Sequence, residues 1–581
     1  MRRSALLVAL LACQPGRHDA PLEQAPPAIP PRATATFPAG WRFEAGSRPA
    51  VSTASAMVAS NSLAASEAGV EILRAGGNAV DAAVAVGFAL AVTYPEAGNL
   101  GGGGYMVIRL ADGTAAALDY REVAPAAATR GMYVDSTGKV TDRGVVGHLA
   151  SGVPGAVAGL VEALRAHGTM SLAEVMAPAI RLAREGFVVD SALSTSLSAA
   201  RGLIGRFSGE ATWLPGGNAP AMGATLRQPA LAGTLRRIAD RGRDGFYRGP
   251  VADAIVAEMR SGSGIITHAD LAAYEAKWRT PLRTTYRGHT LLTMPPSSSG
   301  GVTISESLNI LETWDSTPVF GSTAWVHRLG SAYQLAFIDR NAKLADPDFV
   351  PVPLAELTSK EYARGLRQRI DDRRHTPTST LAPPRPREGS QTTHYSAVDA
   401  RGNAVAVTTT INELYGSGVF VTGGGFFLNN EMDDFTAQPG TPNLFGLVQG
   451  EQNAIAPGKR MLSAMSPTIV LDSADNVLLV LGSRGGPRII TSTSQVILNV
   501  IDHRMSLADA MSAPRWHHQA LPDTLRHEVG GLAPAVRDSL QRMGHAVGTY
   551  GSPGLVIAIM RASSGWEGMV DPRSAGGVVG Y

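Results

Sequence analysis

The chain changes abruptly at Thr392 from a linker to a pair of strands, and this junction constrains the fold more than any other stretch. Residues 371–390 are rich in proline and charge and poor in apolar side chains, which predicts an exposed segment. From Thr392 onward, strand-like runs at 392–398 and 404–410 flank a turn around Arg401, which predicts a hairpin. The fold must therefore accommodate a strand pair that begins where a linker ends.

The register of this hairpin brings two hydroxyl groups together. A turn centred on Arg401 sets Thr392 opposite Thr410, and opposed side chains lie within about 5 Å of each other at Cβ. Threonine becomes a nucleophile when a base takes its proton, and its own free α-amine, with a pKa of roughly 7.7–8.0, can do so. That amine exists only after cleavage between Gln391 and Thr392. The junction thus predicts self-cleavage by attack of the Thr392 hydroxyl on the Gln391 carbonyl; the alternative is an ordinary threonine-rich strand after a surface loop.

Length and charge set outer bounds on the architecture and on the partners. At 581 residues the chain exceeds the usual size of a single core, so two structural parts or one large fold are expected. The 51 basic and 49 acidic residues leave a net charge of +2, and nothing indicates a nucleic-acid partner. The single cysteine, Cys13, excludes an internal disulfide.

The N-terminus predicts an export signal. A basic start at Met1–Arg3 precedes an apolar run, and Leu10–Cys13 resembles a lipoprotein cleavage box with Cys13 as the lipidated residue. An ordinary secretory signal with an accidental cysteine is the alternative. Residues 1–13 are therefore read as the signal and 14–45, rich in proline and alanine, as a flexible tether. We expect an exported protein, in the periplasm or lipid-anchored at the bacterial envelope, that meets the membrane only through this possible anchor.

Helix and strand signals alternate along the rest of the chain. Residues 79–93 are apolar but shorter than the ~20 residues needed to span a bilayer, so they predict a buried helix of small residues. Residues 150–280 are expected to be mainly helical. Further helices are expected at 61–75, 302–313 and about 492–499, and strands at 105–110, 115–120, 426–429, 468–472 and 477–482. The pattern predicts an α+β fold of packed sheets covered by helices.

A series of short motifs runs from about residue 50 to the end of the chain. They are Gly76–Ala83, Gly101–Gly104, Asp119–Glu122, Pro295–Gly301, Gln391–Ser396, Gly402–Thr408, Leu428–Phe435, Met465–Thr468, Ser483–Gly486, Ala513–His518 and Asp571–Ser574. In this order they resemble the γ-glutamyltranspeptidase family. The resemblance implies the four-layer α-β-β-α sandwich of N-terminal-nucleophile hydrolases, self-cleaved into a large subunit (46–391) and a small catalytic subunit (392–581).

The resemblance also implies the catalytic groups. Thr392 is the expected nucleophile, its freed amine the base, and Thr410 the hydroxyl partner that orients it. Gly485 and Gly486 follow a predicted strand, where glycines leave backbone N–H groups open to an oxyanion; a plain tight turn is the alternative.

The expected substrate contacts follow the charges of a γ-glutamyl group. An arginine can bind a carboxylate with two parallel hydrogen bonds, although a surface salt bridge is the ordinary reading of Arg121. The resemblance implies that Arg121 and Ser463 bind the α-carboxylate, and that the α-amino group is held by Asn412, Glu431 and Asp434.

Two residues depart from the family pattern. Ala464 stands where a second serine is common, which removes a donor to the α-carboxylate worth roughly 1.5–3 kcal/mol. Phe445 stands where bacterial relatives often carry a tyrosine, on a lid segment expected at Gln438–Arg460. Weaker binding of the glutamyl group and looser lid closure are the expected consequences.

Two other motifs are not expected to be ligand sites. The glycine run at 98–104 lacks the Lys-Ser/Thr ending of a nucleotide P-loop. The neighbouring His517 and His518 point to opposite sides of an extended segment, so they can hardly bind one metal ion. No cofactor and no metal are expected.

The interpretation that unites these signals is a self-processing γ-glutamyltransferase and hydrolase. It would cleave glutathione or similar γ-glutamyl amides through an ester at Thr392 and transfer the γ-glutamyl group to water, an amino acid or a dipeptide. An acylase of the same superfamily, acting on glutaryl-cephalosporin side chains, is one alternative. A catalytically inactive surface lipoprotein is the other.

Overall fold

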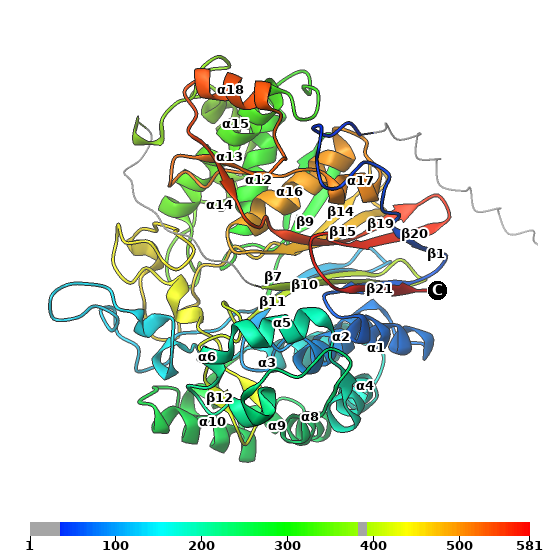
Figure 1. Ribbon diagram of the computed structural model, residues 1–581, viewed down its shortest axis with the longest axis vertical. Helices are drawn as coiled ribbons and strands as arrows, with labels where there is room; N and C mark the ends of the chain where they lie inside the picture. Colours follow the sequence, from blue (N-terminus) through cyan, green and yellow to red (C-terminus); the bar gives the residue numbers. More distant parts are fainter. Residues whose placement is uncertain (1–34, 381–391) are drawn as a thin grey trace, which may run out of the picture. The chain divides into compact units, whose positions relative to one another are not determined.

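Two seven-stranded antiparallel sheets form the centre of the computed structural model, which describes residues 35–380 and 392–581 (Figure 1). In order, the strands of the first sheet are β1 (Val51–Thr53), β20 (Gly565–Val570), β19 (Leu555–Ala562), β15 (Val477–Arg484), β14 (Thr468–Leu471), β9 (His289–Thr293) and β8 (Leu282–Tyr286). Those of the second sheet are β21 (Gly577–Gly580), β2 (Met57–Ser60), β10 (Thr393–Val398), β11 (Ala404–Thr410), β3 (Gly103–Arg109), β4 (Ala115–Tyr120) and β7 (Lys277–Arg279). Buried apolar side chains from both sheets form one cluster, so the sheets pack face to face.

Helices cover the outer face of each sheet (Figure 1). One apolar cluster joins the second sheet to α1 (Leu63–Arg74), α2 (Ala79–Thr93), α3 (Ala156–His167), α4 (Leu172–Glu185), α5 (Ser191–Ala199), α6 (Arg201–Ile204), α7 (Glu210–Trp213), α8 (Pro229–Arg241), α9 (Asp244–Tyr247), α10 (Pro250–Ser261) and α11 (His268–Ala273). A second cluster joins the first sheet to α12 (Gly300–Leu311), α13 (Thr323–Lys343), α15 (Lys360–Arg367), α16 (Arg488–Ile501), α17 (Leu507–Ser512) and α18 (Pro534–Arg542). The predicted four-layer α-β-β-α sandwich is confirmed.

Shorter elements lie outside the two large sheets and the helices that cover them. Helix α14 (Leu354–Leu357) packs beside α12 and α15. Three small sheets pair β5 (Phe187–Val188) with β6 (Thr225–Leu226), β12 (Phe420–Val421) with β13 (Phe426–Phe427), and β17 (Leu525–Glu528) with both β16 (Trp516–His517) and β18 (Val547–Tyr550).

Helix α2 is buried along its whole length, as predicted, and has the predicted bounds. Asn78 and Asp81 cap its first turn reciprocally: Asn78 Oδ1 accepts from Asp81 N at 3.0 Å, and Asp81 Oδ2 accepts from Asn78 N at 2.7 Å. A Cβ at Gly87 would lie 2.7 Å from the hydroxyl of Tyr395 on β10. Small residues on α2 therefore allow the helix to lie close to the central strands.

Strands β10 and β11 form the predicted hairpin in the predicted register, with Val398 opposite Ala404 and Thr393 opposite Thr409. β2 pairs with the free edge of β10 and β3 with that of β11, so the hairpin lies at the centre of its sheet. All residues of both strands are buried. Since β10 begins at Thr393, Thr392 is the residue immediately before the strand.

One predicted strand and the start of the predicted linker differ from the structure. The strand expected at 426–429 is limited to Phe426–Phe427, and the Asn429 side chain beyond it donates instead to the backbone of Gly101 at 2.8 Å. Residues 371–380 do not form the fully exposed linker that was expected. Thr378 there is buried, and its hydroxyl donates to the carbonyl of Ala520 at 2.9 Å.

The described part of the predicted tether, residues 35–45, packs on the fold. Trp41 and Phe43 are buried, and Trp41 Nε1 donates to the carbonyl of Ser512 at 2.9 Å, so this part of the chain does not extend freely. Cys13, the rest of the tether and Gln391 lie outside the described residues. Within the described ranges, no helix is long and apolar enough to cross a membrane.

Asp399 ties the hairpin turn to helix α2. Its Oδ1 accepts from the N–H groups of Arg401 at 2.9 Å and Asn403 at 3.0 Å, and its Oδ2 accepts from Ala79 N at 3.0 Å. Because Asp399 is buried and Ala79 begins the helix, one carboxylate holds both the turn and the positive end of the helix dipole.

We expect Asp399→Ala to lower the free energy of unfolding by about 2–4 kcal/mol, because several buried N–H donors lose a charged acceptor. Asp472 provides a matched control. It accepts from Ala474 N at 2.8 Å and Asn476 N at 3.0 Å in an exposed turn. Asp472→Ala should cost only about 0.5–1 kcal/mol. Urea unfolding of both variants measures the difference, and equal losses would show that the contact with α2 adds nothing.

Candidate active site

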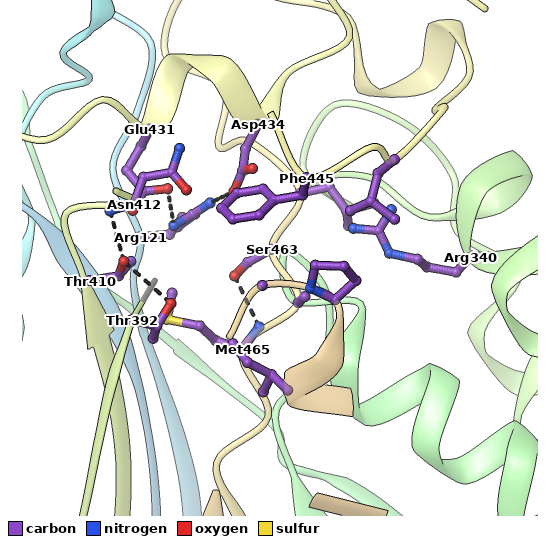
Figure 2. A pocket seen from close by; sticks show the side chains of 16 residues that line it. Arg121, Arg340, Thr392, Thr410, Asn412, Glu431, Asp434, Phe445, Ser463 and Met465 are labelled. Carbon is purple, nitrogen blue, oxygen red and sulfur yellow. Dashed lines mark hydrogen bonds and ion pairs between the residues drawn. The ribbon is translucent and has the colours of Figure 1, made fainter. Parts of the chain in front are cut away.

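Thr392 and Thr410 lie side by side at one end of the central hairpin, as predicted (Figure 2). Their Oγ1 atoms are 3.5 Å apart, and Thr392 is only 4% exposed. Thr410 Oγ1 accepts from Asn412 N at 2.7 Å, while its carbonyl accepts from Asn99 Nδ2 at 2.9 Å. Hydrogen bonds therefore fix both the hydroxyl and the carbonyl of Thr410, and the hydroxyl faces Thr392.

Asn412 connects the end of β11 to an acidic turn. Its φ of +76° lies in the left-handed region, which asparagine tolerates better than most residues. Its Nδ2 donates to the carbonyl of Asn430 at 3.0 Å, and Asn430 Oδ1 accepts from Glu413 N at 3.0 Å. The next residues form the short 3₁₀ turn Glu431–Asp434, so these contacts tie the acidic turn to the end of β11 that carries Thr410.

Gly485 and Gly486 follow the end of β15 and precede α16. Both have positive φ, 127° and 56°, which favours glycine, and a Cβ at Gly485 would lie 2.9 Å from Gly554 Cα. Among the described residues, neither glycine N–H has a backbone acceptor. With the N-terminus of α16 directly after them, these N–H groups are suited to stabilise negative charge near Thr392.

Arg121 is buried at the end of β4 and is surrounded by carboxylates (Figure 2). Its Nη1 lies 2.6 Å from Glu431 Oε2 and 3.6 Å from Glu122 Oε2, and its Nη2 forms a short ion pair with Asp434. The cation predicted for one end of the substrate and the anions predicted for the other end are thus direct neighbours.

Arg121 and the surrounding carboxylates change one another's pKa values. Burial raises the pKa of each of the three carboxyl groups, Glu122, Glu431 and Asp434, although Arg121 opposes the shift. Burial alone would lower the pKa of Arg121, but the carboxylates raise it above its ordinary value, so Arg121 stays charged. One cation faces three acids, and proton uptake by an acid reduces the surplus negative charge.

Ser463 is held by a neighbouring loop. Its N–H donates to the carbonyl of Ser297 at 3.1 Å, and its carbonyl accepts from both Ser299 N at 2.7 Å and Ser299 Oγ at 2.5 Å. The Ser463 hydroxyl accepts from Met465 N at 3.2 Å. Ser463 and its chain neighbour Ala464 both line one cavity.

One cavity of about 310 Å³ collects almost all the predicted site residues. Of the predicted site residues that the structure describes, only Gly485 is not part of its wall; Gln391 and Cys13 lie outside the described residues. Phe445 and Leu447 reach it from the expected lid. The lining residues are Arg121, Arg340, Thr392, Thr410, Asn412, Glu431, Asp434, Phe445, Leu447, Leu462, Ser463, Ala464, Met465, Gly486, Pro487 and Ile489.

Three residues that shape this site were not predicted from the sequence. Asn99 fixes Thr410, Glu122 adds a third carboxylate, and Arg340 adds a second cation to the wall. The burial of Arg340 could have been predicted from helical spacing. Arg340 lies on the same face of α13 as the buried Tyr333 and Phe337, where a charged residue is unusual.

Comparisons with known proteins agree with this geometry. A family model described as gamma-glutamyltranspeptidase matches residues 65–581. The glutathione hydrolase proenzyme of Escherichia coli (strain K12) is 47% identical over 525 residues, which cover 89% of this chain and 90% of that protein. The acylase ACY 1 proenzyme of Pseudomonas sp. (strain SE83) is 42% identical over 502 residues, covering 84% of this chain and 87% of that protein.

Solved structures of related enzymes have the same fold as this chain. The cephalosporin acylase from Bacillus halodurans superposes with a TM-score of 0.81 at 28% sequence identity, and the match covers 94% of this chain and 99% of that one. The fold, the order of the motifs and the family model over most of the length agree. This chain belongs to the γ-glutamyltranspeptidase family.

Proposed function

We propose that this protein is a self-processing γ-glutamyltransferase and hydrolase that cleaves the γ-glutamyl amide bond of glutathione and related compounds. The observation that carries the proposal is the shared cavity, in which a threonine pair, a buried arginine and two carboxylates meet. Family membership and the E. coli relative named as a glutathione hydrolase proenzyme support the same chemistry.

The chemistry begins when the chain is cut before Thr392. The Thr392 hydroxyl attacks the γ-carbonyl carbon while its proton moves to the freed α-amine, and the Gly485 and Gly486 N–H groups stabilise the oxyanion. The C–N bond then breaks, and the leaving amine takes the proton. Water, or the amine of an amino acid or dipeptide, attacks the resulting ester and returns a proton to the Thr392 oxygen.

The charges of the cavity suit a zwitterionic donor. Its α-carboxylate would bind near Arg121 and Ser463, and its α-ammonium near Asn412, Glu431 and Asp434. A buried acidic pair gains an opposite charge when the ammonium enters, which offsets part of the cost of burying the carboxylates.

Acylase activity on glutaryl side chains is a second candidate function, and two observations favour it. Ala464 removes a hydroxyl from the carboxylate end of the cavity, and acylases are among the similar proteins. A glutaryl group carries no ammonium, however, so Glu431 and Asp434 would face it without a cationic partner other than Arg121.

Hydrolysis of L-γ-glutamyl-p-nitroanilide and glutaryl-p-nitroanilide separates the two candidates. We expect the γ-glutamyl compound to be used at least tenfold better in kcat/KM, because one desolvated opposite-charge contact is worth roughly 1.5–3 kcal/mol. Glycylglycine should raise release of nitroaniline if a dipeptide amine accepts the γ-glutamyl group. Preference for the glutaryl compound would assign the protein to the acylases.

Self-cleavage tests the nucleophile. The wild-type precursor should give two fragments on a denaturing gel, the smaller beginning at Thr392, and Thr392→Ala should remain one inactive chain because it lacks the attacking hydroxyl. Thr393→Ala is the neighbouring control and should still be cut. Cleavage of Thr392→Ala at the same bond would refute the intramolecular mechanism.

We also propose that the protein is exported and carries a lipid on Cys13, from the sequence of its first residues. In a bacterial host, the wild type should partition into the membrane fraction, and Cys13→Ala should not, because the thiol that accepts the lipid is gone. Equal partitioning of both proteins would contradict lipidation at this residue.

A further inference from the structure

The cavity contains a second buried cation besides Arg121. Arg340, near the end of α13, is 1% exposed, and its side chain forms part of the cavity wall. Figure 2 shows Arg121 on one side of Phe445 and Arg340 on the other. The two arginine side chains therefore line the same cavity from different sides.

Arg340 differs from Arg121 in its partners. Its Nε donates to Ser299 Oγ at 3.1 Å, and its Nη1 donates to Asn341 Oδ1 at 2.9 Å and to Gln449 Oε1 at 3.1 Å. All three acceptors are neutral. Within the described residues, no Asp or Glu lies at ion-pair distance from Arg340, whereas Arg121 has three carboxylates around it.

Because its hydrogen-bond partners are neutral, the positive charge of Arg340 can attract an anion in the cavity. Burial lowers the pKa of Arg340 to about 10, and Asp434 opposes the shift, so the group is still a cation at neutral pH. A charge held by neutral dipoles away from water acts strongly on its surroundings, because the local dielectric constant is low. An anion entering the cavity would meet a cation that forms no ion pair with any described residue.

Two successive hydrogen bonds connect Arg340 to Ser463. Arg340 Nε donates to Ser299 Oγ, and Ser299 Oγ donates to the carbonyl of Ser463 at 2.5 Å. Ser463 is expected to bind the α-carboxylate. The second cation is thus fixed two hydrogen bonds from the backbone carbonyl of Ser463, in the wall of the cavity that Ala464 also lines.

We propose that Arg340 is a specificity-determining residue that stabilises the α-carboxylate of the donor from the side opposite Arg121, an inference that rests on the proposed function. Arg121 is already offset by Glu122, Glu431 and Asp434, so a donor carboxylate gains from a further cation that has no carboxylate at ion-pair distance among the described residues. Arg340 supplies that charge through space and compensates for the hydroxyl missing at Ala464.

Three anilides separate this role from a purely structural one. L-γ-glutamyl- and glutaryl-p-nitroanilide both carry the distal carboxylate, and 4-aminobutyryl-p-nitroanilide lacks it. Arg340→Gln should lower kcat/KM for the carboxylate-bearing anilides by about tenfold, mainly through KM, since one buried charge contact is lost. Its activity on the aminobutyryl anilide should change less than twofold.

Matched variants separate charge from geometry. Arg340→Lys keeps the charge and should retain most of the preference for the carboxylate-bearing substrates. Arg328→Gln removes an arginine from the same helix, where its Nη1 donates to the carbonyl of Ser316, and should leave the preference unchanged. Ala464→Ser should raise γ-glutamyl activity more in the Arg340→Gln background than in the wild type. Self-cleavage of each variant on a gel reports that it has folded.

Equal losses on all three anilides, or a Lys variant as defective as the Gln variant, would overturn the proposal and leave Arg340 a positioning residue. Failure of the proposed function looks different: the wild type would use the glutaryl anilide and not the γ-glutamyl one. The role of Arg340 would then be decided by the glutaryl to aminobutyryl ratio.

Discussion

Backbone pairing between β10 and β11 is the constraint on which the rest of the site depends. Both faces of these strands are buried, so a slip of one residue would turn every side chain to the wrong face. The register is therefore strongly specified, and it holds Thr392 against Thr410. Asp399 at the turn and Asn99 at the open end fix the hairpin from both sides.

The site itself is an electrostatic balance assembled from distant parts of the chain. Arg121 comes from the end of β4, the carboxylates from the turn after β13, and Arg340 from α13. Burying so many charges is costly unless each finds a partner. The arrangement is explicable as a cavity shaped for a ligand with both a positive and a negative end, because the protein groups alone leave an acidic surplus around Arg121 and, at Arg340, a cation with no ion-pair partner among the described residues.

Features set by residues close together in the chain could be predicted from the sequence. The hairpin register, the bounds of α2 and the strand Ala115–Tyr120 followed from periodicity, turn residues and capping, and all three are confirmed. The grouping of Arg121, Asn412 and Ser463 in one cavity came from resemblance, since no local pattern brings such distant residues together. Arg340 was missed because its role depends on how α13 meets the loop at Ser299, and the packing of Trp41 was missed because proline-rich composition masks single aromatic anchors.

The order of strands has a consequence for the processed protein. In both sheets, strands that follow Thr392 pair directly with strands that precede it: β10 with β2, β11 with β3, β14 with β9 and β20 with β1. The two chains left by cleavage would therefore share continuous sheets and common cores. Separating them means breaking backbone ladders at the centre of the molecule, so dissociation and unfolding become a single event. A mature molecule could exchange its small chain for another only by losing its fold, and recovery from denaturation would then depend on protein concentration, unlike that of the uncut precursor.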